Sequence, residues 1–211
     1  IYVSLDVHLF RCQMDKIYKI LENRDVKIIE DSAHALEGRY KKEFLGTLGD
    51  LGTFSFHETK NIVSGEGGCL AVNKEELIKR SEIIREKGTN RSAFFRGEVD
   101  KYRWMDVGSS FLPSEIISAF LYSQLEEIDS IQKKRFFMVF KNQKNRDDYI
   151  NYMKNNGIKV VFHYLPLHSS PFYKKKHGDR KLVNTDKFSR CLVRLPLFPD
   201  LKPEQQSLII D

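Results

Sequence analysis

Cysteine is scarce in this sequence, and long apolar runs are missing. The three cysteines, Cys12, Cys69 and Cys191, are odd in number and lie far apart, which argues against a disulfide framework and against the ligand spacing of a metal site. No stretch reaches the roughly 18 consecutive apolar residues that a membrane span needs. The first residues also lack a signal-peptide pattern. These features predict a cytoplasmic protein with no metal and no membrane span.

A large excess of one charge is also absent. The chain has 35 Lys and Arg against 29 Asp and Glu, a net charge of +6, and its densest basic runs, residues 133–135 and 174–176, are short. This balance favours a Lys-rich solvated surface with some affinity for anionic ligands over a nucleic-acid partner. An anion- or nucleic-acid-binding α/β protein stays open as an alternative function.

Helix and strand patterns alternate along the chain. Helical periodicity and end signals indicate helices at residues 14–23, 75–87, 113–135 and 147–156, with a short one from Pro203. Short apolar runs indicate strands at residues 26–29, 53–56, 69–72, 136–140 and 159–164. A length of 211 residues allows one large domain or two small ones. The alternation predicts an α/β protein with a parallel sheet.

The junction between Arg135 and Phe136 is unusual. A helix with a stripe of apolar residues ends in a basic run and meets a strand with no Gly, Pro, Asn or Asp between them. Either the boundary lies several residues away, or a segment is missing at this point.

Lys60 is the first candidate for chemistry. The strand at residues 53–56 contains Ser55, Lys60 follows five residues later, and a turn at residues 65–68 contains three glycines. A lysine amine that is partly unprotonated can bond covalently to an aldehyde. Taken alone, Lys60 is more often a surface lysine, and the glycines are more often plain turn structure.

Asp31 and His34 form the second candidate group. Asp31 follows a buried apolar run, at the end of a strand where α/β folds bind ligands. A carboxylate there suits the ring nitrogen of pyridoxal phosphate (PLP), because a protonated ring is the better electron sink. Asp31 could equally cap a helix, and His34 alone is more often a core histidine.

Together these segments resemble the DegT/DnrJ/StrS family of sugar aminotransferases. Three stretches carry the resemblance: F-S-F-H-E-T-K-N with G-E-G-G (residues 54–61 and 65–68), I-I-R-E-K-G-T-N-R-S (83–92), and F-F-R-G-E-V-D-K-Y (94–102) leading into D-V-G-S-S (106–110). Two later stretches, V-F-H-Y-L-P-L-H (161–168) and R-L-P-L-F (194–198), resemble the family's C-terminal part. Any one piece is weak evidence, and their agreement is specific.

The resemblance implies a fold-type I PLP-dependent transferase similar to aspartate aminotransferase. It has a large domain with a parallel or mixed sheet and a small C-terminal α/β domain. Lys60 matches the lysine that holds PLP, Asp31 the acid that pairs with the pyridine nitrogen, and His34 a residue beside the ring oxygen. Ser55 matches a hydroxyl on the cofactor phosphate. Ser110 stands where many relatives have an asparagine that reaches the neighbouring subunit's phosphate, so a homodimer with shared active sites is implied.

The resemblance also implies the substrates. L-Glutamate would donate an amino group to C4 of a dTDP-linked 4-keto-6-deoxy sugar, giving dTDP-4-amino-4,6-dideoxygalactose for cell-surface polysaccharides of the lipopolysaccharide or enterobacterial common antigen type. Asn90 and Arg91 resemble a loop near the nucleotide sugar, where a guanidinium suits a diphosphate. His163, Tyr164 and His168 are expected at the substrate end.

The match leaves out parts of the family pattern. The phosphate cradle at a helix start and the aromatic residue that stacks on the cofactor precede the matched region in relatives, and further small-domain elements are expected at the Arg135–Phe136 junction. Residues 1–112 are therefore expected to form a partial PLP-binding domain, and residues 113–211 a linking helix and a partial small domain. The alternatives are an inactive truncated paralogue and a PLP enzyme with another reaction outcome.

Overall fold

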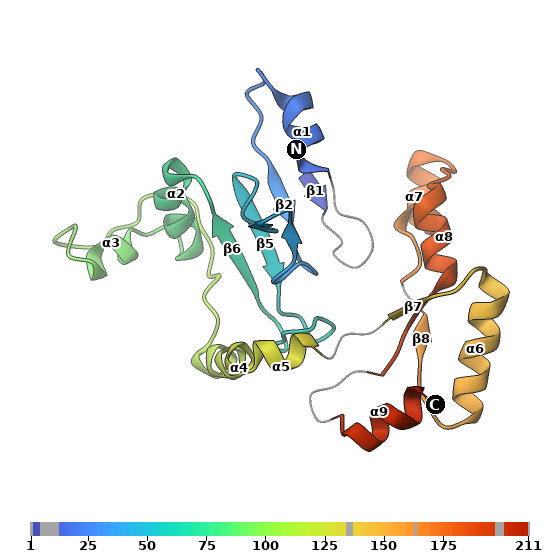
Figure 1. The fold of residues 1–211 in the computed structure, drawn as a ribbon. Helices are drawn as coiled ribbons and strands as arrows, with labels where there is room; N and C mark the ends of the chain where they lie inside the picture. Colours follow the sequence, from blue (N-terminus) through green and yellow to red (C-terminus); the bar gives the residue numbers. More distant parts are fainter. Residues whose placement is uncertain (1, 5–12, 134–136, 163, 197–200, 211) are drawn as a thin grey trace. The chain divides into compact units, whose positions relative to one another are not determined.

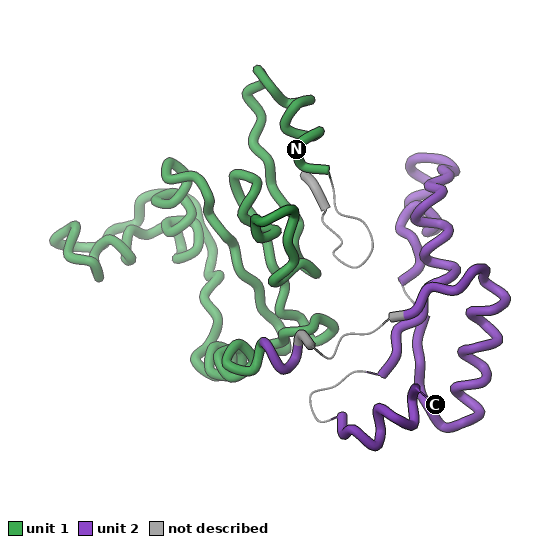
Figure 2. The backbone as a smooth tube through the Cα atoms, in the orientation of Figure 1, with its two compact units in different colours: residues 1–128 green, residues 129–211 purple. Residues whose placement is uncertain are grey.

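The computed structural model describes residues 2–4, 13–133, 137–162, 164–196 and 201–210. The chain divides into two compact units, residues 1–128 and residues 129–211 (Figure 2). The helix expected to link two domains lies mostly in the first unit, and a domain boundary at residue 112 remains a prediction. Each unit has its own sheet and is described by itself.

Unit 1 is built on a four-stranded mixed sheet in the order β1-β2-β5-β6 (Figure 1). The strands are β1 (Tyr2–Ser4), β2 (Ile29–Asp31), β5 (Leu51–Ser55) and β6 (Gly68–Val72). The first three are parallel, and β6 runs antiparallel to β5. The parallel sheet expected from the alternation is therefore wrong for β6. The reason is that residues 56–67 connect β5 to β6 without a crossover helix, so the chain returns antiparallel.

Strand β2 lies further along the chain than its apolar run. The strand was expected at residues 26–29, yet the ladder spans Ile29–Asp31, with Asp31 opposite Thr53 of β5. Two carboxylates thus belong to the strand itself instead of following it. Glu30 is completely buried, a position that an acidic residue almost never occupies without partners.

Backbone amides stabilise the buried Glu30. Its carboxylate accepts N–H bonds from Leu48 and Gly49, both 2.5 Å from Oε1, and from Gly46, 2.9 Å from Oε2. On the other side of this loop, the Asn73 side-chain amide donates to the carbonyls of Gly46 and Gly49, each at 3.0 Å. Residues 46–49, here called the clasp loop, are thus fixed through both their donors and their acceptors.

The clasp loop requires glycine because other backbone lies against it. Gly46 has φ +87°, a conformation that L side chains rarely adopt. Gly52 of β5 packs so closely on the Gly46 carbonyl that an added Cβ would overlap it. The loop therefore sets the position of β5 beside β2.

Helices and a hairpin complete unit 1. The helices are α1 (Met14–Leu21), α2 (Glu75–Arg85), α3 (Arg91–Phe95) and α4 (Glu115–Glu126), and the hairpin joins β3 (Arg39–Tyr40) to β4 (Glu43–Phe44). Helix α1 buries Met14 and Leu21 against Ile28, Ala35 and Leu45, which form the apolar core beside the clasp loop. The helices predicted at residues 14–23 and 75–87 are confirmed.

The single long helix predicted for residues 113–135 is wrong. Ser114 caps α4 by accepting an N–H bond from Ile117 at 3.3 Å, so Pro113 precedes the helix instead of lying in its first turn. Helix α4 ends at Glu126, and a separate helix α5 (Ile128–Lys133) follows, crossing the boundary between the two units. The apolar stripe on α4 stays largely uncovered, since α4 buries no residue.

Unit 2 contains a three-stranded antiparallel sheet in the order β7-β9-β8. Its strands are β7 (Phe137–Val139), β8 (Val161–Phe162) and β9 (Leu192–Arg194), and its helices are α6 (Gln143–Asn155), α7 (Pro171–His177), α8 (Val183–Cys191) and α9 (Pro203–Ile210), with a 3-10 turn, η1 (Leu167–Ser169). Met153, Val160 and Val193 form its core. The helices predicted at residues 147–156 and from Pro203 are confirmed. The strands predicted at 136–140 and 159–164 are confirmed for Phe137–Val139 and Val161–Phe162, and residues 136 and 163 lie outside the described residues. Helices α7 and α8 and the central strand β9 carried no pattern.

We predict that Glu30→Gln destabilises unit 1. The amide keeps one acceptor oxygen and places an NH₂ group against backbone donors, so the free energy of unfolding should fall by roughly 3 kcal/mol. Urea unfolding followed by circular dichroism measures this loss, and hydrogen exchange should quicken at the amides of Gly46, Leu48 and Gly49. Glu43→Gln, at an exposed position in β4, is the matched control. Equal stability of the two variants would contradict the role of the clasp loop.

Candidate active site

Lys60 lies in the connection between β5 and β6. This connection is held closed at its base by backbone bonds: Phe56 N–H donates to Gly67 at 2.9 Å, and Glu58 N–H donates to Gly65 at 2.8 Å. Lys60 N–H in turn donates to the His57 carbonyl at 2.9 Å. The lysine therefore has a defined position above the carboxyl end of β5, where the parallel strands β2 and β5 both end.

His34 is the residue that contacts the Lys60 amine. Lys60 Nζ lies 2.9 Å from His34 Nε2, and both side chains are partly buried. The two residues are 26 positions apart, and they meet because β2 and β5 are neighbours. A neutral imidazole nitrogen at this distance can accept a proton from the ammonium group or return it. Lys60 and His34 thus lie within hydrogen-bond distance of each other.

Asp31 ends strand β2 on the same edge of the sheet. Its Oδ1 accepts the Ala33 N–H at 3.1 Å, and the Ser32 N–H donates to the Thr53 carbonyl at 2.9 Å. These bonds turn the chain after the strand and lead directly to His34. The interpretation of Asp31 as a helix cap is wrong, because Asp31 closes a turn and no helix follows it.

Ser55 is the last residue of β5, two positions beyond the pairing of Asp31 with Thr53. Its hydroxyl accepts the His57 N–H in a long bond of 3.4 Å. The amine, imidazole, carboxylate and hydroxyl of Lys60, His34, Asp31 and Ser55 therefore come from the carboxyl ends of two adjacent strands. This is the edge where α/β proteins bind ligands.

Asn90 and Arg91 lie on a second part of unit 1, at the start of α3. Asn90 Oδ1 accepts the Arg103 N–H at 2.7 Å and closes the segment between them. Arg91 Nη1 pairs with Oε1 of Glu86 at 2.9 Å, and its guanidinium stacks 5.0 Å from the Phe95 ring centroid. Ser92 Oγ also approaches the other oxygen of Glu86, at 3.4 Å. Glu86, which is buried, thus orients the arginine.

The backbone of Ser110 pairs with the segment that precedes α3. Its backbone forms an isolated antiparallel bridge with Glu86, and the preceding Ser109 carbonyl accepts the Lys87 N–H at 2.9 Å. The Ser110 residue is exposed. Residues 86–92 and residues 103–110 therefore form one local structure, which the sequence motifs alone did not reveal.

The expected substrate residues of unit 2 differ in environment. His168 is buried, and its Nε2 lies 2.9 Å from Asp186 Oδ1. Tyr164 is exposed, with the Arg194 guanidinium 5.2 Å from its ring centroid. His163 lies outside the described residues. The buried His168 is thus bonded to its own unit, and its expected place at the substrate end stays a prediction.

Sequence reasoning missed the acids that hold these residues in place. Glu86 and Asp186 were not singled out, although each is the partner of a predicted site residue. No motif marks them, because Glu86 follows an ordinary helix and Asp186 lies in a helix with no clear periodicity. Only the contacts identify them.

The described part of the chain holds neither a candidate metal cluster nor a candidate membrane-spanning helix. No cluster of three or more His, Cys, Asp or Glu side chains that could hold a metal is present there, and no helix among the described residues is long and apolar enough to cross a membrane. Partial burial raises the pKa of the Cys69 thiol, which disfavours the thiolate that a cysteine nucleophile requires.

The donor set at the ends of β2 and β5 fits PLP. Lys60 supplies the amine that would hold the aldehyde carbon, and Asp31 supplies the carboxylate for a ring nitrogen. Ser55 supplies one hydroxyl for a phosphate. A phosphate cradle of several backbone N–H groups was not identified among the described residues near Ser55, so the fit covers the reactive end of the cofactor better than its phosphate.

Comparison with known proteins agrees with this fit. The chain matches the DegT/DnrJ/EryC1/StrS aminotransferase family in two segments, residues 5–139 and 135–211. MJ1066, an uncharacterized protein of Methanocaldococcus jannaschii, is 29% identical over 230 residues, covering 90% of this chain and 60% of that protein. The UDP-4-amino-4,6-dideoxy-N-acetyl-beta-L-altrosamine transaminase of Campylobacter jejuni is 23% identical, covering 94% of this chain and 61% of the transaminase.

Solved structures share the fold. PseC of Helicobacter pylori, an aminotransferase of pseudaminic acid biosynthesis, superposes with a TM-score of 0.76 at 20% identity, over 95% of this chain and 62% of PseC. The PLP form of Spr1654, a sugar aminotransferase of Streptococcus pneumoniae, gives a TM-score of 0.72 at 19% identity, over the whole chain and 67% of that structure. These neighbours confirm the predicted fold-type I architecture. The match to the aminotransferase family supports PLP as the cofactor.

The chain spans about three fifths of the length of the two relatives named above. The alignment with MJ1066 extends over 230 positions, more than the 211 residues of the chain, so that relative has residues with no counterpart here. The two matched segments meet at residues 135–139, the junction that lacks turn residues. Both segments, and with them nearly the whole chain, belong to the DegT/DnrJ/EryC1/StrS aminotransferase family.

Proposed function

We propose that this chain carries the reactive centre of a PLP-dependent sugar-nucleotide aminotransferase. In this proposal an amino group passes from L-glutamate to C4 of a nucleotide-linked 4-keto-6-deoxy sugar. The observation that carries it is the contact of 2.9 Å between Lys60 Nζ and His34 Nε2, on the sheet edge where Asp31 ends its strand.

In this proposal the site residues have two tasks, which are to hold the cofactor and to transfer protons. PLP, when bound, supplies an electrophilic carbon and an electron-withdrawing ring. Lys60 would hold the cofactor and, once released from it, move a proton as general base and acid. His34 would keep the Lys60 amine in place and exchange a proton with it. The Asp31 carboxylate would keep the ring nitrogen protonated.

The substrate end of the proposal depends on Asn90 and Arg91. Arg91 is fixed by Glu86 and by the Phe95 ring, which leaves its remaining guanidinium N–H groups for an anion such as a sugar diphosphate. The name of the Campylobacter jejuni relative describes a UDP-linked 4-amino-4,6-dideoxy sugar, which supports C4 as the site of amination. A dTDP-linked sugar and a role in cell-surface polysaccharide synthesis are the specific form we propose.

We expect this chain on its own to bind PLP weakly. A cofactor phosphate without its backbone cradle loses several charge-assisted hydrogen bonds, each contributing roughly 1.5–3 kcal/mol. The proposal therefore has two parts. Lys60, Asp31 and His34 would carry out the chemistry of the family. The affinity for PLP would depend on segments that longer relatives have. An inactive, shortened paralogue is the alternative.

Lys60→Ala should abolish whatever covalent PLP binding the chain has. We expect the parent chain, titrated with PLP, to develop a visible absorption band that borohydride fixes, with the label mapped to Lys60 by mass spectrometry. Lys42→Ala, at an exposed lysine of the same unit, should label like the parent. Loss of the band on adding L-glutamate would extend the result to amino transfer.

Two outcomes would contradict parts of this proposal. Labelling at another lysine, with Lys60 unmodified, would remove Lys60 as the cofactor lysine. Tight PLP binding by the chain would remove the expectation of weak binding. If instead the chain binds DNA with a steep dependence on salt and takes up no PLP at saturating concentration, the nucleic-acid alternative is favoured.

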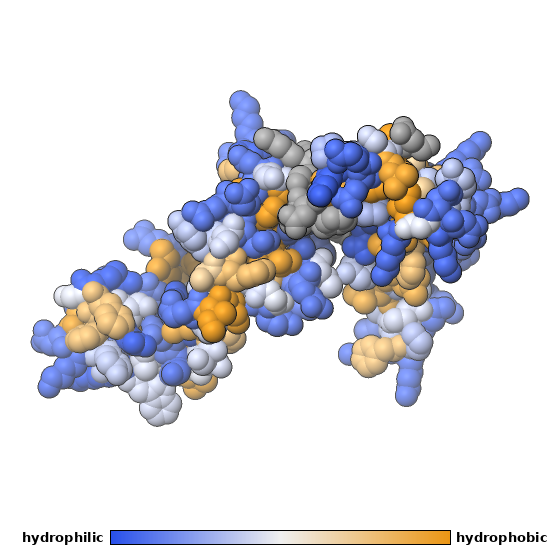
Figure 3. Space-filling view, turned by 90° about the horizontal axis from the view of Figure 1, so that it is seen from below, coloured by the Kyte–Doolittle hydropathy of each residue, from blue (hydrophilic) through white to orange (hydrophobic). Residues whose placement is uncertain are grey.

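We further propose that the chain forms a homodimer through the surface around Ser110. Trp104, Val107, Phe111 and Ile116 are 77%, 75%, 64% and 82% exposed, and they flank Ser110 in the sequence. On the face drawn in Figure 3, apolar side chains lie at the surface among hydrophilic ones. We propose that these exposed apolar residues belong to the interaction site, where a second copy would bring Ser110 to a shared active site.

Ile116→Lys should therefore shift the chain toward monomer. A lysine placed in an apolar contact must be desolvated, which should weaken self-association about tenfold or more. Sedimentation velocity over a concentration series measures the change. Ile78→Lys, at an exposed position of α2, is the control and should associate like the parent. A parent chain that stays monomeric at high micromolar concentration would contradict the dimer.

A further inference from the structure

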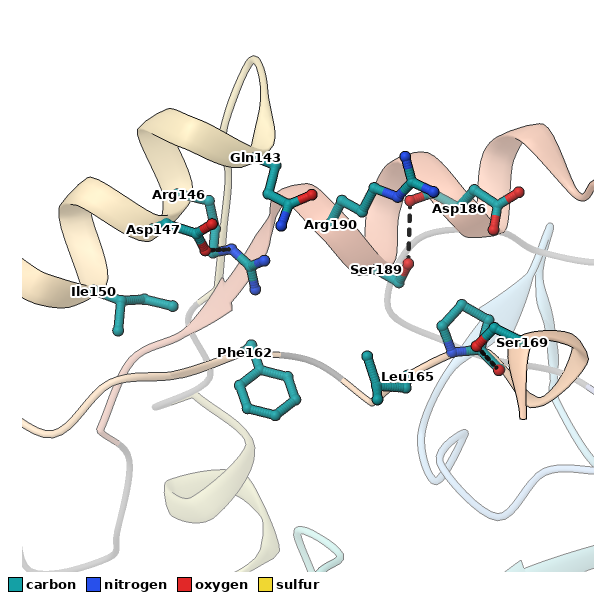
Figure 4. Close-up of a pocket in the computed structure, with 11 residues that line it drawn as sticks. Gln143, Arg146, Asp147, Ile150, Phe162, Leu165, Ser169, Asp186, Ser189 and Arg190 are labelled. Atoms are coloured by element: carbon teal, nitrogen blue, oxygen red, sulfur yellow. Dashed lines mark hydrogen bonds and ion pairs between the residues drawn. The ribbon is translucent and has the colours of Figure 1, made fainter. Parts of the chain in front are cut away.

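Unit 2 contains a cavity of about 550 Å³ between α6, α8 and the segment that follows β8. Cavities of this size are typical of sites for small molecules. All the lining residues belong to unit 2, and they are polar on the α6 and α8 sides and apolar where Phe162 and Leu165 lie (Figure 4). A molecule that fits must therefore combine an apolar body with a polar group.

Arg146 is the polar residue that defines this cavity. Its side chain is only 8% exposed, and Figure 4 shows the guanidinium directed from α6 toward the space above Phe162. A guanidinium stays charged at every accessible pH, so the cavity has a permanent positive charge. Burying such a charge is costly unless it is paired and hydrogen-bonded.

The pairing of Arg146 is incomplete. Its Nε lies 2.7 Å from Asp147 Oδ1, yet this atom is buried without a hydrogen-bond partner among the described residues, so the contact is an ion pair with poor alignment. Asp147 is about half exposed and shares its charge with water. The guanidinium thus keeps hydrogen-bond donors available on its cavity side.

A second arginine lies on the opposite wall. Arg190 comes from α8, and its side chain forms no ion pair or hydrogen bond within the described part of the chain. The nearby acid, Asp186, is already engaged, because its two carboxylate oxygens accept from His168 Nε2 at 2.9 Å and from the Leu182 N–H at 3.2 Å. The wall thus carries two arginines and two aspartates, and Arg146, whose buried Nε lacks a hydrogen-bond partner among the described residues, is the cation with a donor left for an anion.

We propose that this cavity binds a small organic carboxylate. Arg146 would receive the carboxylate on its planar guanidinium, a geometry that supports two parallel N–H bonds. Arg190 adds a second positive charge at the cavity wall, and Phe162 and Leu165 cover the apolar body of the ligand. His168 acts as a positioning residue, because it keeps Asp186 turned away from Arg190. The proposal does not depend on PLP chemistry.

Succinate is the probe for the test, measured by isothermal titration calorimetry on the whole chain. We expect Arg146→Met to abolish succinate binding, and Arg190→Gln to weaken it about tenfold, the loss of one charge-assisted hydrogen bond. Arg180→Gln, at an exposed arginine of the same unit, should bind within twofold of the parent. Because Arg146→Met removes a buried group, circular dichroism must show that the variant is folded. The exposed Arg190 provides the second, less disruptive variant.

Three outcomes would overturn the proposal. The first is the absence of succinate binding by the parent at millimolar concentration. The second is equal binding by the parent and Arg190→Gln. The third is binding of inorganic phosphate or of neutral succinamide with the same affinity as succinate. Equal binding of phosphate would mean that the cavity selects charge alone, and equal binding of succinamide would mean that it selects apolar shape alone. PLP uptake is unaffected by each of these results, so failure here is distinct from failure of the proposed aminotransferase function.

Discussion

The buried carboxylate of Glu30 is the constraint on which unit 1 depends. A polar group with no exposure is stable only when its hydrogen-bonding capacity is satisfied, and the three N–H bonds from the clasp loop achieve this for the Glu30 side chain. The same bonds position the loop that precedes β5, and Asn73 fixes the loop from the other side. The next residue along β2 is Asp31. Asp31, the acid that we propose for the cofactor ring, thus directly follows a residue that three hydrogen bonds hold in place.

The antiparallel return of β6 has a comparable consequence for Lys60. A crossover helix after β5 would carry the chain away from the sheet edge. The direct connection through residues 56–67 keeps Lys60 above the strand ends, where it meets His34. The mixed sheet, which departs from the pattern of alternating strands and helices, is therefore what brings the amine and the imidazole together.

Acids that orient cationic or ring side chains recur in both units. Glu86 holds Arg91 in unit 1, and Asp186 holds His168 in unit 2. In each case a side chain that motif reading assigns to a ligand is first engaged by its own unit. Such engagement fixes the rotamer, and at Arg91 it leaves the remaining guanidinium donors for the diphosphate that we propose as its ligand.

The sequence by itself determined the family, the α/β class, most helices and the identity of Lys60, Asp31 and His34 as candidates, since these depend on local motifs and on periodicity. It misplaced β2, joined α4 to α5, and gave no signal for β9, because strand position and helix breaks depend on partners distant in the chain. The tertiary structure alone decided that Glu30 is the buried anchor, that β6 runs antiparallel, and that His168 pairs with Asp186. The physical reason is the same in each case. The free energy of a buried polar group or of a strand edge depends on the groups packed against it, and those groups lie far away in the sequence. Even His168 and Asp186 are 18 residues apart.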